Sequence, residues 1–350
     1  MSAHAALPPT LRSIAPALAL VAALAACSSE PEPSELRFTS LGTTVEVKVI
    51  DPGSADAEAA VQAAREEIDA VSDAWNPAGD GELAALNERL AQGEGMRVSE
   101  ELVAILERAQ HIERISDGRF SPAIGGLTRL WGFSEADGPL EEPPPEDEIA
   151  DWVAQEPRLA DLEISGREVR SGNDAVQIDL GGIGKGFAGE RARGALADAG
   201  VAAALISLGG DLVTLGAPAD RPWRMGVRHP RDEAILASVS ARSDEHVFTS
   251  GDYERTFTHA ERRYHHILDP TTGYPAMGSR SVTVIHEDPI LADASSTALF
   301  IAGPEAWREL AEALGIERAL LIDAEGAAHM TEAMAERVEL ERDIEPVHTD

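Results

Sequence analysis

Residues 176–191, VQIDLGGIGKGFAGER, constrain the fold more than any other stretch of this 350-residue chain. A β-branched, alternating segment runs into glycines at positions 184, 186 and 189, and a helical pattern follows. The glycine spacing satisfies the G-x-G-x-x-G pattern of a dinucleotide-binding turn, and Lys185 supplies the GK pair of a P-loop. Gly186, however, stands where a P-loop needs a serine or threonine for Mg²⁺. The stretch therefore predicts a phosphate-binding turn of neither usual kind.

A second glycine turn, SLGGDL, follows at 207–212. Asp211 in this turn lies near the distance at which a Rossmann fingerprint places its ribose-binding acid. It follows two glycines, however, and so does not end a strand as that fingerprint requires. Tight backbone geometry alone is the alternative explanation for the glycines of both turns.

Charge excludes one broad class of function. The chain has 62 acidic and 29 basic residues, for a net charge of −33, and such a surface repels nucleic-acid phosphates. Among the basic residues only Lys48 and Lys185 are lysines, which makes a lysine inside the glycine loop more notable. With 43% hydrophobic residues the chain can still build a sizeable core.

The N-terminus predicts export. An apolar run from Ile14 ends in small residues before Cys27, and a Pro- and Glu-rich spacer follows. The run is short for a membrane span and is typical of a cleaved signal peptide. LAAC, ending at Cys27, resembles a bacterial lipobox, whereas a buried Ala-rich helix is the alternative. We expect a signal peptide over 1–26, lipidation of Cys27, a tether over 27–36 and no disulfide, since the chain has one cysteine.

Hydrophobic periodicity predicts an α+β fold. A strand over 37–50 is followed by helices over 56–75 and 99–116, the second with Ser99 as its N-cap. Strands then dominate, with helices interspersed irregularly rather than in strict βαβ alternation. The predicted strands are 175–180, 203–208, 223–228, 237–241, 246–250, 264–269 and 281–286, and the predicted helices are 185–199, 290–302 and 304–314. We therefore expect one domain over 37–325, followed by a peripheral acidic tail over 326–350.

Two further segments carry groups with catalytic potential. Asp293 and Thr297 are four apart in a helical pattern, so both project from one face and offer the hard oxygen ligands that suit Mg²⁺. Purely structural roles, a helix N-terminal acid and a hydroxyl bonded to a backbone carbonyl, are the alternative. Of the tandem His265 and His266, which point to opposite faces of a strand, one is a candidate general base. Ser250, at a strand end, is a candidate phosphate or ribose contact.

Seven segments in order resemble the ApbE-type flavin transferases, bacterial FAD:protein FMN transferases that are commonly periplasmic lipoproteins. They are SDGRFSPAIGGLTRLWGFS (116–134), IDLGGIGKGFAGERA (178–192), SLGGDLVTLG (207–216), PWRMGVRHP (222–230), SGDYERTF (250–257), HILDPTTGYP (266–275) and ADASSTALFIAGP (292–304). The resemblance implies a single domain with a mixed, largely antiparallel sheet, flanking helices and a central FAD cleft.

By that resemblance, the chain cleaves FAD with Mg²⁺, attaches FMN through a phosphoester to a threonine of an acceptor protein, and releases AMP. A Mg²⁺-dependent FAD pyrophosphatase, a flavin-binding lipoprotein without turnover and a nicotinamide oxidoreductase are the alternatives. The acceptor implied is an extracytoplasmic subunit of a membrane electron-transport complex, and the location implied is the periplasmic side of a membrane.

The resemblance also implies residue roles. His266 is the base that takes the acceptor's proton, and His265 is structural. Gly182, through its carbonyl, joins Asp293 and Thr297 as Mg²⁺ ligands. The implied FAD contacts are Leu41, Trp75, Arg119, Phe120, Ser121, Asp179, Lys185, Ser250, Gly251 and Ile267. Leu41 and Trp75 stand where the family has methionine and tyrosine, near the isoalloxazine ring, and Gly184 stands where it has alanine.

Overall fold

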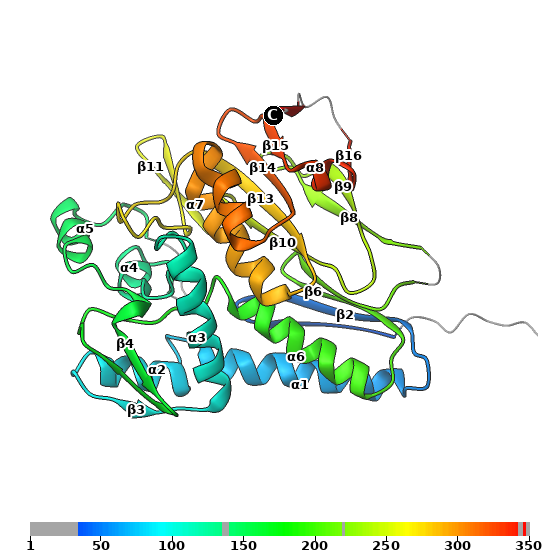
Figure 1. Cartoon of the computed structure of the whole chain (residues 1–350), viewed down its shortest axis with the longest axis horizontal. Coiled ribbons are helices and arrows are strands. Elements are labelled where there is room, and N and C mark those ends of the chain that lie inside the picture. Colours follow the sequence, from blue (N-terminus) through cyan, green and yellow to red (C-terminus); the bar gives the residue numbers. More distant parts are fainter. Residues whose placement is uncertain (1–33, 135–139, 219–220, 342–345, 348–350) are drawn as a thin grey trace, which may run out of the picture. The chain divides into compact units, whose positions relative to one another are not determined.

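A nine-stranded sheet forms the centre of the fold in the computed structural model, which describes residues 34–134, 140–218, 221–341 and 346–347 (Figure 1). Neighbouring strands are antiparallel except for the last pair, which is parallel, so the predicted mixed and largely antiparallel sheet is confirmed. In spatial order the strands are β1 (Ser34–Ser40), β2 (Thr43–Asp51), β6 (Ala203–Leu208), β7 (Asp211–Leu215), β10 (His246–Gly251), β13 (Ser279–His286), β14 (Arg318–Asp323), β15 (Ala328–Met330) and β17 (Pro346–Val347).

Smaller sheets and the helices complete the fold. One three-stranded sheet consists of β16 (Val338–Leu340), β9 (Ile235–Ala241) and β8 (Trp223–Arg228). A second consists of β3 (Met96–Arg97), β5 (Glu168–Ser171) and β4 (Leu162–Ser165). The strands β11 (Thr256–His259) and β12 (Arg262–His265) form a hairpin. The helices are α1 (Ala57–Trp75), α2 (Glu82–Leu90), α3 (Glu100–Ile115), α4 (Gly125–Leu130), α5 (Glu146–Val153), α6 (Gly184–Asp198), α7 (Pro289–Leu314) and α8 (Glu332–Ala335), with a 3₁₀ turn at η1 (Leu159–Asp161).

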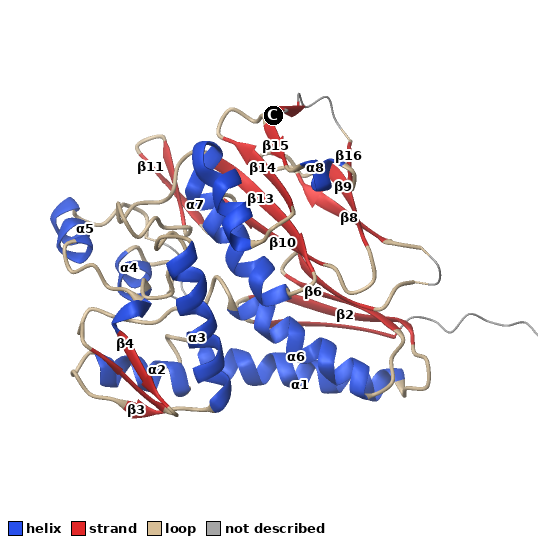
Figure 2. Ribbon diagram, viewed as in Figure 1, coloured by secondary structure: helices blue, strands red, loops and turns tan. Residues whose placement is uncertain are grey.

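The two faces of the nine-stranded sheet are covered differently. Helices α1, α6 and α7 pack on one face (Figure 2), and the sheet β16-β9-β8 packs on the other. Period-two alternation divides the side chains between these two cores. On β13, for example, Val282 and Val284 join the core under the helices, whereas Ile285 joins the core under β8 and β9.

Close helix packing explains two glycines of the glycine loop. A Cβ on Gly186 would lie 2.4 Å from the carbonyl oxygen of Pro289, and one on Gly189 would lie 2.6 Å from Cγ2 of Val213. Because backbone at the start of α7 cannot yield as a flexible side chain can, Gly186 sets how closely α6 approaches α7. Gly194, on the same helix, has no atom of another described residue within 4 Å of its Cβ position, apart from its neighbours along the helix.

These contacts predict opposite effects for two alanine substitutions on one helix. Gly186→Ala should lower the free energy of unfolding by about 3 kcal/mol, because the new methyl group forces α6 and α7 apart. Gly194→Ala should raise it by about 0.5–1 kcal/mol through helix propensity alone. Urea denaturation of both variants measures the difference. Equal effects of the two substitutions would show that α6 tolerates the methyl group at position 186.

The predicted single strand over 37–50 is wrong in one respect: it is the hairpin of β1 and β2. Leu41 and Gly42 form its turn with φ of 53° and 68°, the left-handed region that two-residue hairpin turns require. The amide nitrogen of Leu41 donates to Ser72 Oγ of α1 at 3.1 Å, which holds the turn against that helix. Alternation alone could not locate the turn because it continues on both sides of it.

The strand predicted over 175–180 is also wrong. Val176 and Ile178 are fully buried, as the alternation indicated, but the segment forms only an isolated bridge between Gln177 and Ile124. The side chain of Asn87 replaces a neighbouring strand: its amide donates to the Ile178 carbonyl at 2.8 Å and accepts from the Ile178 amide at 2.7 Å. The extended backbone is therefore satisfied by one buried side chain.

The folded domain extends past both predicted boundaries. β1 begins at Ser34, inside the expected tether, and β15 pairs with β14 beyond residue 325. Met334, in the expected peripheral tail, is fully buried, and β16 adds to β9. The acidic composition of the tail concealed these apolar anchors.

Two other expectations concern the ends of helices and the N-terminus. The helices predicted over 290–302 and 304–314 form one element, α7, broken at Gly303, whose φ of 66° is not helical.

The proposed signal peptide, Cys27 and the tether up to residue 33 lie outside the described residues. None of the helices in the described ranges is both long enough and apolar enough to span a bilayer.

Burial of His246 predicts a pH-dependent stability. Its Nδ1 accepts a hydrogen bond from the Thr214 amide at 3.1 Å, and burial lowers its pKa to about 4. Below pH 6.5 His246 is protonated in the unfolded protein but stays neutral in the folded protein. The free energy of unfolding therefore falls as the pH falls. Between pH 7 and 5 the loss from His246 should be about 2 kcal/mol. His246→Asn keeps an acceptor for the Thr214 amide and should remove this part of the pH dependence of the free energy of unfolding, measured by urea denaturation at several pH values. An unchanged pH dependence would show that other groups cause it.

Candidate active site

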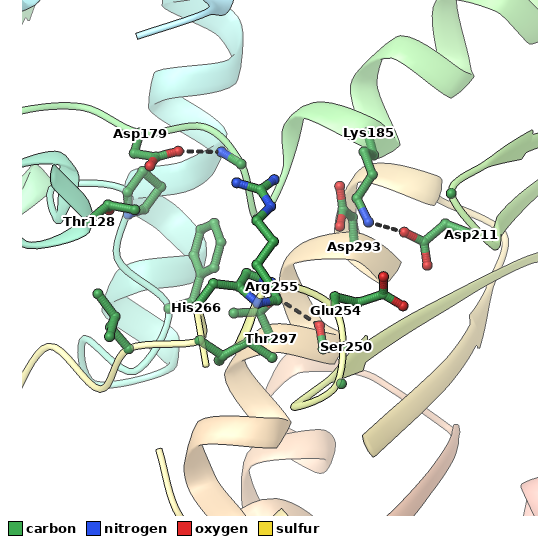
Figure 3. A pocket seen from close by; sticks show the side chains of 18 of the residues that line it. Thr128, Asp179, Lys185, Asp211, Ser250, Glu254, Arg255, His266, Asp293 and Thr297 are labelled. Carbon is green, nitrogen blue, oxygen red and sulfur yellow. Dashed lines mark hydrogen bonds and ion pairs between the residues drawn. The ribbon is translucent and has the colours of Figure 1, made fainter. Parts of the chain in front are cut away.

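A cavity of about 340 Å³ opens where the N-terminus of α6, the first turns of α7 and the end of β10 meet (Figure 3). These elements come from distant parts of the sequence, and the loops at 119–122, 179–182 and 266–268 complete the walls. Of the residues predicted to contact FAD or Mg²⁺ or to act as the base, the cavity is lined by Leu41, Arg119, Phe120, Ser121, Asp179, Gly182, Lys185, Ser250, Gly251, His266, Ile267, Asp293 and Thr297.

Trp75 is the exception among the predicted contacts. Its side chain is 8% exposed, belongs to the main hydrophobic core and packs against Phe187 with ring centroids 4.5 Å apart. It does not line the cavity. The structure thus gives Trp75 a packing role at the end of α1, where we expected contact with the flavin.

Lys185 projects from the first turn of α6 into the cavity and forms an ion pair with Asp211 (Figure 3). The Asp211 carboxylate is 3% exposed, and its other oxygen accepts from the Thr249 amide at 2.7 Å. Although burial opposes the charge of Lys185, the Asp211 and Asp293 carboxylates together raise its pKa. The lysine is therefore a fixed cation beside the glycine loop.

Asp293 points into the same region from the second turn of α7 (Figure 3). The carboxylate is buried, and Oδ2 accepts from the Gly186 amide at 2.8 Å, which ties the start of α6 to α7. Burial raises the pKa of this carboxyl, and Lys185 only partly offsets that effect. Because burial disfavours the charged form of this carboxyl, a nearby cation would stabilise the carboxylate.

Three hydroxyl groups meet near Asp293, those of Thr297, Ser250 and Ser296. Thr297 is one helical turn further along α7, as the four-residue spacing predicts, and its Oγ1 lies 3.0 Å from Ser250 Oγ. Ser250 also bonds to Ser296 at 2.8 Å. The glycine loop approaches closely, since a Cβ on Gly182 would lie 3.6 Å from Thr297 Oγ1. Carboxylate, hydroxyl and loop backbone therefore converge in one place.

His266 follows the end of β12 and borders the cavity, whereas His265 points into the protein. His265 Nε2 bonds to the Ala276 carbonyl at 2.9 Å, in keeping with its predicted structural role. His266 Nδ1 is buried and has no hydrogen-bond partner among the described residues. Burial and the Arg255 guanidinium lower the pKa of His266 to about 3, so the imidazole is neutral near pH 7.

Sequence reasoning missed a buried carboxylate behind the cavity wall. Glu113, on α3, is 4% exposed and accepts from Ser121 Oγ at 2.5 Å and from the Leu159 amide at 3.1 Å. Burial raises its pKa, and these hydrogen bonds oppose that rise. Glu113 therefore fixes Ser121 and its loop. The sequence signal that could have identified Glu113 is an acidic residue on the apolar face of an amphipathic helix.

The charges around the cavity nearly cancel. Asp211, Glu254 and Arg255 were not predicted as site residues, yet all three border it. The sequence argues against Asp211 as a ribose contact, and it does not indicate that Asp211 forms an ion pair with Lys185. The charged lining comprises Arg119, Lys185 and Arg255 against Asp179, Asp211, Glu254 and Asp293. One more carboxylate than cations means that a diphosphate needs additional positive charge here.

Solved structures share this fold. The ApbE protein of Thermotoga maritima is 31% identical and superposes with a TM-score of 0.82 over 89% of this chain and all of that one. The apo form of Pseudomonas stutzeri flavinyl transferase ApbE is 28% identical, with a TM-score of 0.75 over 87% of this chain and 96% of that one.

Curated relatives and a family model agree with the structures. A FAD:protein FMN transferase of Rhodobacter capsulatus is 37% identical over 88% of this chain, which spans 59% of that relative's length. One from Haemophilus influenzae is 28% identical over 85% of this chain and 88% of its own length. The ApbE family model matches residues 41–320. The chain therefore belongs to the ApbE family.

Proposed function

We propose that this protein is a Mg²⁺-dependent FAD:protein FMN transferase. It cleaves FAD and attaches FMN to a threonine of an acceptor protein, with release of AMP. The observation that carries the proposal is the convergence, in one cavity, of Lys185, the buried Asp293 carboxylate, the Thr297 hydroxyl and the neutral His266. The names of the curated relatives support the same reaction.

The oxygen groups at the start of α7 fit Mg²⁺. The described residues hold no cluster of three or more His, Cys, Asp or Glu that could bind a metal by themselves. Mg²⁺ suits such a sparse site, because it keeps waters and takes further ligands from substrate phosphates. Asp293, Thr297 and the Gly182 carbonyl would hold it. When bound, it supplies Lewis-acid stabilisation of charge on the diphosphate oxygens.

The residues of the chain position the substrates and move one proton. Lys185, held by Asp211, neutralises charge on the diphosphate. His266 accepts the proton of the acceptor threonine as its oxygen attacks the FMN phosphorus. The new bond joins that oxygen to phosphorus, the diphosphate P–O bond breaks, and AMP leaves with the bonding electrons. Phe133 meets the His266 ring edge-on, with ring centroids 6.5 Å apart, and helps to orient it.

The sequence before the described residues supports an exported, lipid-anchored protein. In this proposal, lipidated Cys27 holds the domain on the periplasmic side of a membrane, and the acceptor is an extracytoplasmic subunit of an electron-transport complex. Fractionation tests the anchor: wild-type protein should sediment with membranes, and Cys27→Ala should remain in the supernatant.

The reaction itself is tested with FAD, Mg²⁺ and an acceptor protein that carries a flavinylation threonine. We expect AMP release together with a fluorescent acceptor band in a denaturing gel, and we expect both to require acceptor and Mg²⁺. AMP released without acceptor would instead indicate a pyrophosphatase. FAD that stays intact under all conditions would indicate a flavin-binding protein without turnover.

A further inference from the structure

A second cavity, of about 250 Å³, lies next to the candidate active site and has the opposite charge to the rest of the molecule. Four arginines line it: Arg231 from the loop after β8, Arg262 and Arg263 from β12, and Arg280 from β13. Among the described residues that line it, Asp252 is the only one with a carboxylate. In a chain with 62 acidic and 29 basic residues, arginines gathered around a single carboxylate are contrary to the average charge of the protein.

Most of this positive charge is not neutralised by the described residues. Arg231 binds both oxygens of Asp252, at 2.7 and 2.5 Å, and uses up that carboxylate. Arg262 lies over the ring of Tyr264, and Arg280 donates to the Ala324 carbonyl. Arg263 forms no ion pair or side-chain hydrogen bond with any described residue. Arg263 is therefore available to an anion that enters the cavity, and no carboxylate of the described residues forms an ion pair with Arg262 or Arg280.

Ser279 adds an independent indication of a ligand. The residue is 5% exposed and borders the cavity, yet its hydroxyl has no hydrogen-bond partner in the described parts of the chain. A buried hydroxyl without a partner costs free energy, which a ligand oxygen would recover. Guanidinium groups and a hydroxyl donor together suit an oxyanion such as a carboxylate.

The position of the cavity indicates where the anion comes from. Asp252 and His265 border this cavity, while their neighbours Gly251 and His266 border the candidate active site. Because a strand rises about 3.4 Å per residue, Arg263 lies within about 11 Å of His266 along the chain. Met277, which is 65% exposed, also borders the cavity, and methionine and arginine are both enriched in protein interfaces. A protein segment that presents a hydroxyl to His266 can therefore reach the arginines.

We propose that this arginine-lined cavity docks an acidic side chain of the acceptor protein, next to the segment that carries the modified threonine. The inference rests on the proposed transferase function. It makes the acceptor's aspartate or glutamate part of substrate recognition, separate from the groups that bind FAD.

Steady-state kinetics of FMN transfer test the cavity with two variants and a matched control. Arg263→Gln should raise the KM for the acceptor about tenfold, while kcat and the KM for FAD stay unchanged. Ser279→Ala should raise the acceptor KM severalfold without lowering thermal stability, because the hydroxyl has no hydrogen-bond partner among the described residues. Arg170→Gln, on the exposed surface of β5, removes the same charge elsewhere and should change neither constant.

A double-mutant cycle identifies the docked group. When acidic residues near the acceptor threonine are replaced by amides one at a time, one replacement should show no additional effect in Arg263→Gln. An unchanged acceptor KM in the double variant Arg262→Gln/Arg263→Gln would overturn the proposal. So would a loss of binding to phosphatidylglycerol vesicles in that variant with acceptor kinetics intact, since the cavity would then serve a lipid headgroup.

The docking site and the proposed function can fail separately. If wild-type protein forms no covalent flavin on any acceptor, the proposed function fails. Calorimetric titration with a hexaglutamate peptide still examines the cavity in that case. Binding to wild-type protein that Arg263→Gln weakens about tenfold supports an acidic-peptide site, whereas equal binding by both proteins, or by neither, contradicts it.

Discussion

Asp293→Asn should reduce the rate of FMN transfer about a thousandfold, the size of effect seen when a preorganised electrostatic group is removed from an active site. The carboxylate is buried, accepts from the Gly186 amide and lies one helical turn from Thr297. An asparagine fills the same volume but provides no negative charge for Mg²⁺. The NH₂ group of the asparagine is a donor, and it would point at either the Gly186 amide or the metal, both of which need an acceptor oxygen.

Metal binding distinguishes this explanation from a general disturbance of the site. Titration with Mn²⁺ in the presence of bound FAD, followed by electron paramagnetic resonance, should show tighter binding in wild-type protein than in Asp293→Asn. Asp288→Asn is the matched control: it removes a carboxylate from the same helix, and asparagine can still cap α7 by accepting from Ile290 and Leu291. The control should keep its activity within about twofold. Normal Mn²⁺ affinity in Asp293→Asn would contradict the role of Asp293 as a ligand.

The parts of this site that are local in sequence could be predicted from the residues alone. Asp293 and Thr297 share a helix face because four residues make about one turn. The Ser99 N-cap was equally local, and its hydroxyl does accept from the Leu102 amide at 3.1 Å. Such features depend only on backbone geometry over a few residues.

Long-range partners could not be predicted in this way. Lys185 and Asp211 are 26 residues apart, on the first turn of α6 and at the start of β7, and only the packing of α6 against β7 brings them together. Asn87 and Ile178 are 91 residues apart, and their hydrogen bonds turn a strand-like pattern into a loop. Alternation reports which side chains are buried but not which group satisfies the backbone.

Resemblance supplied most of the remaining site, and it was less informative about individual orientations. It indicated that Ser250, His266 and the residues of 119–121 belong together, and all of them border one cavity. It did not indicate that Trp75 packs against Phe187. The direction of a large side chain depends on its immediate neighbours in the core, which a motif does not record.

His266→Gln should have the second large effect, lowering kcat for FMN transfer about a thousandfold with little change in FAD affinity. In the proposed reaction the imidazole would accept the acceptor's proton, whereas a glutamine amide is not basic enough to do so. Because Lys185 and Asp293 remain in place, FAD and metal should still bind. Fluorescence titration with FAD, together with single-turnover formation of the fluorescent acceptor, separates binding from chemistry.

Two other histidines make the test specific. His259→Gln, on the exposed β11 strand, should leave both measurements unchanged. His265→Gln should chiefly lower the melting temperature, because His265 links the Ala276 carbonyl to the Ile267 amide inside the protein. If His265→Gln slowed transfer as strongly as His266→Gln while remaining folded, the proton acceptor would not be assigned to His266. A selective loss in His266→Gln, with FAD still bound, is the result that the neutral, cavity-facing imidazole predicts.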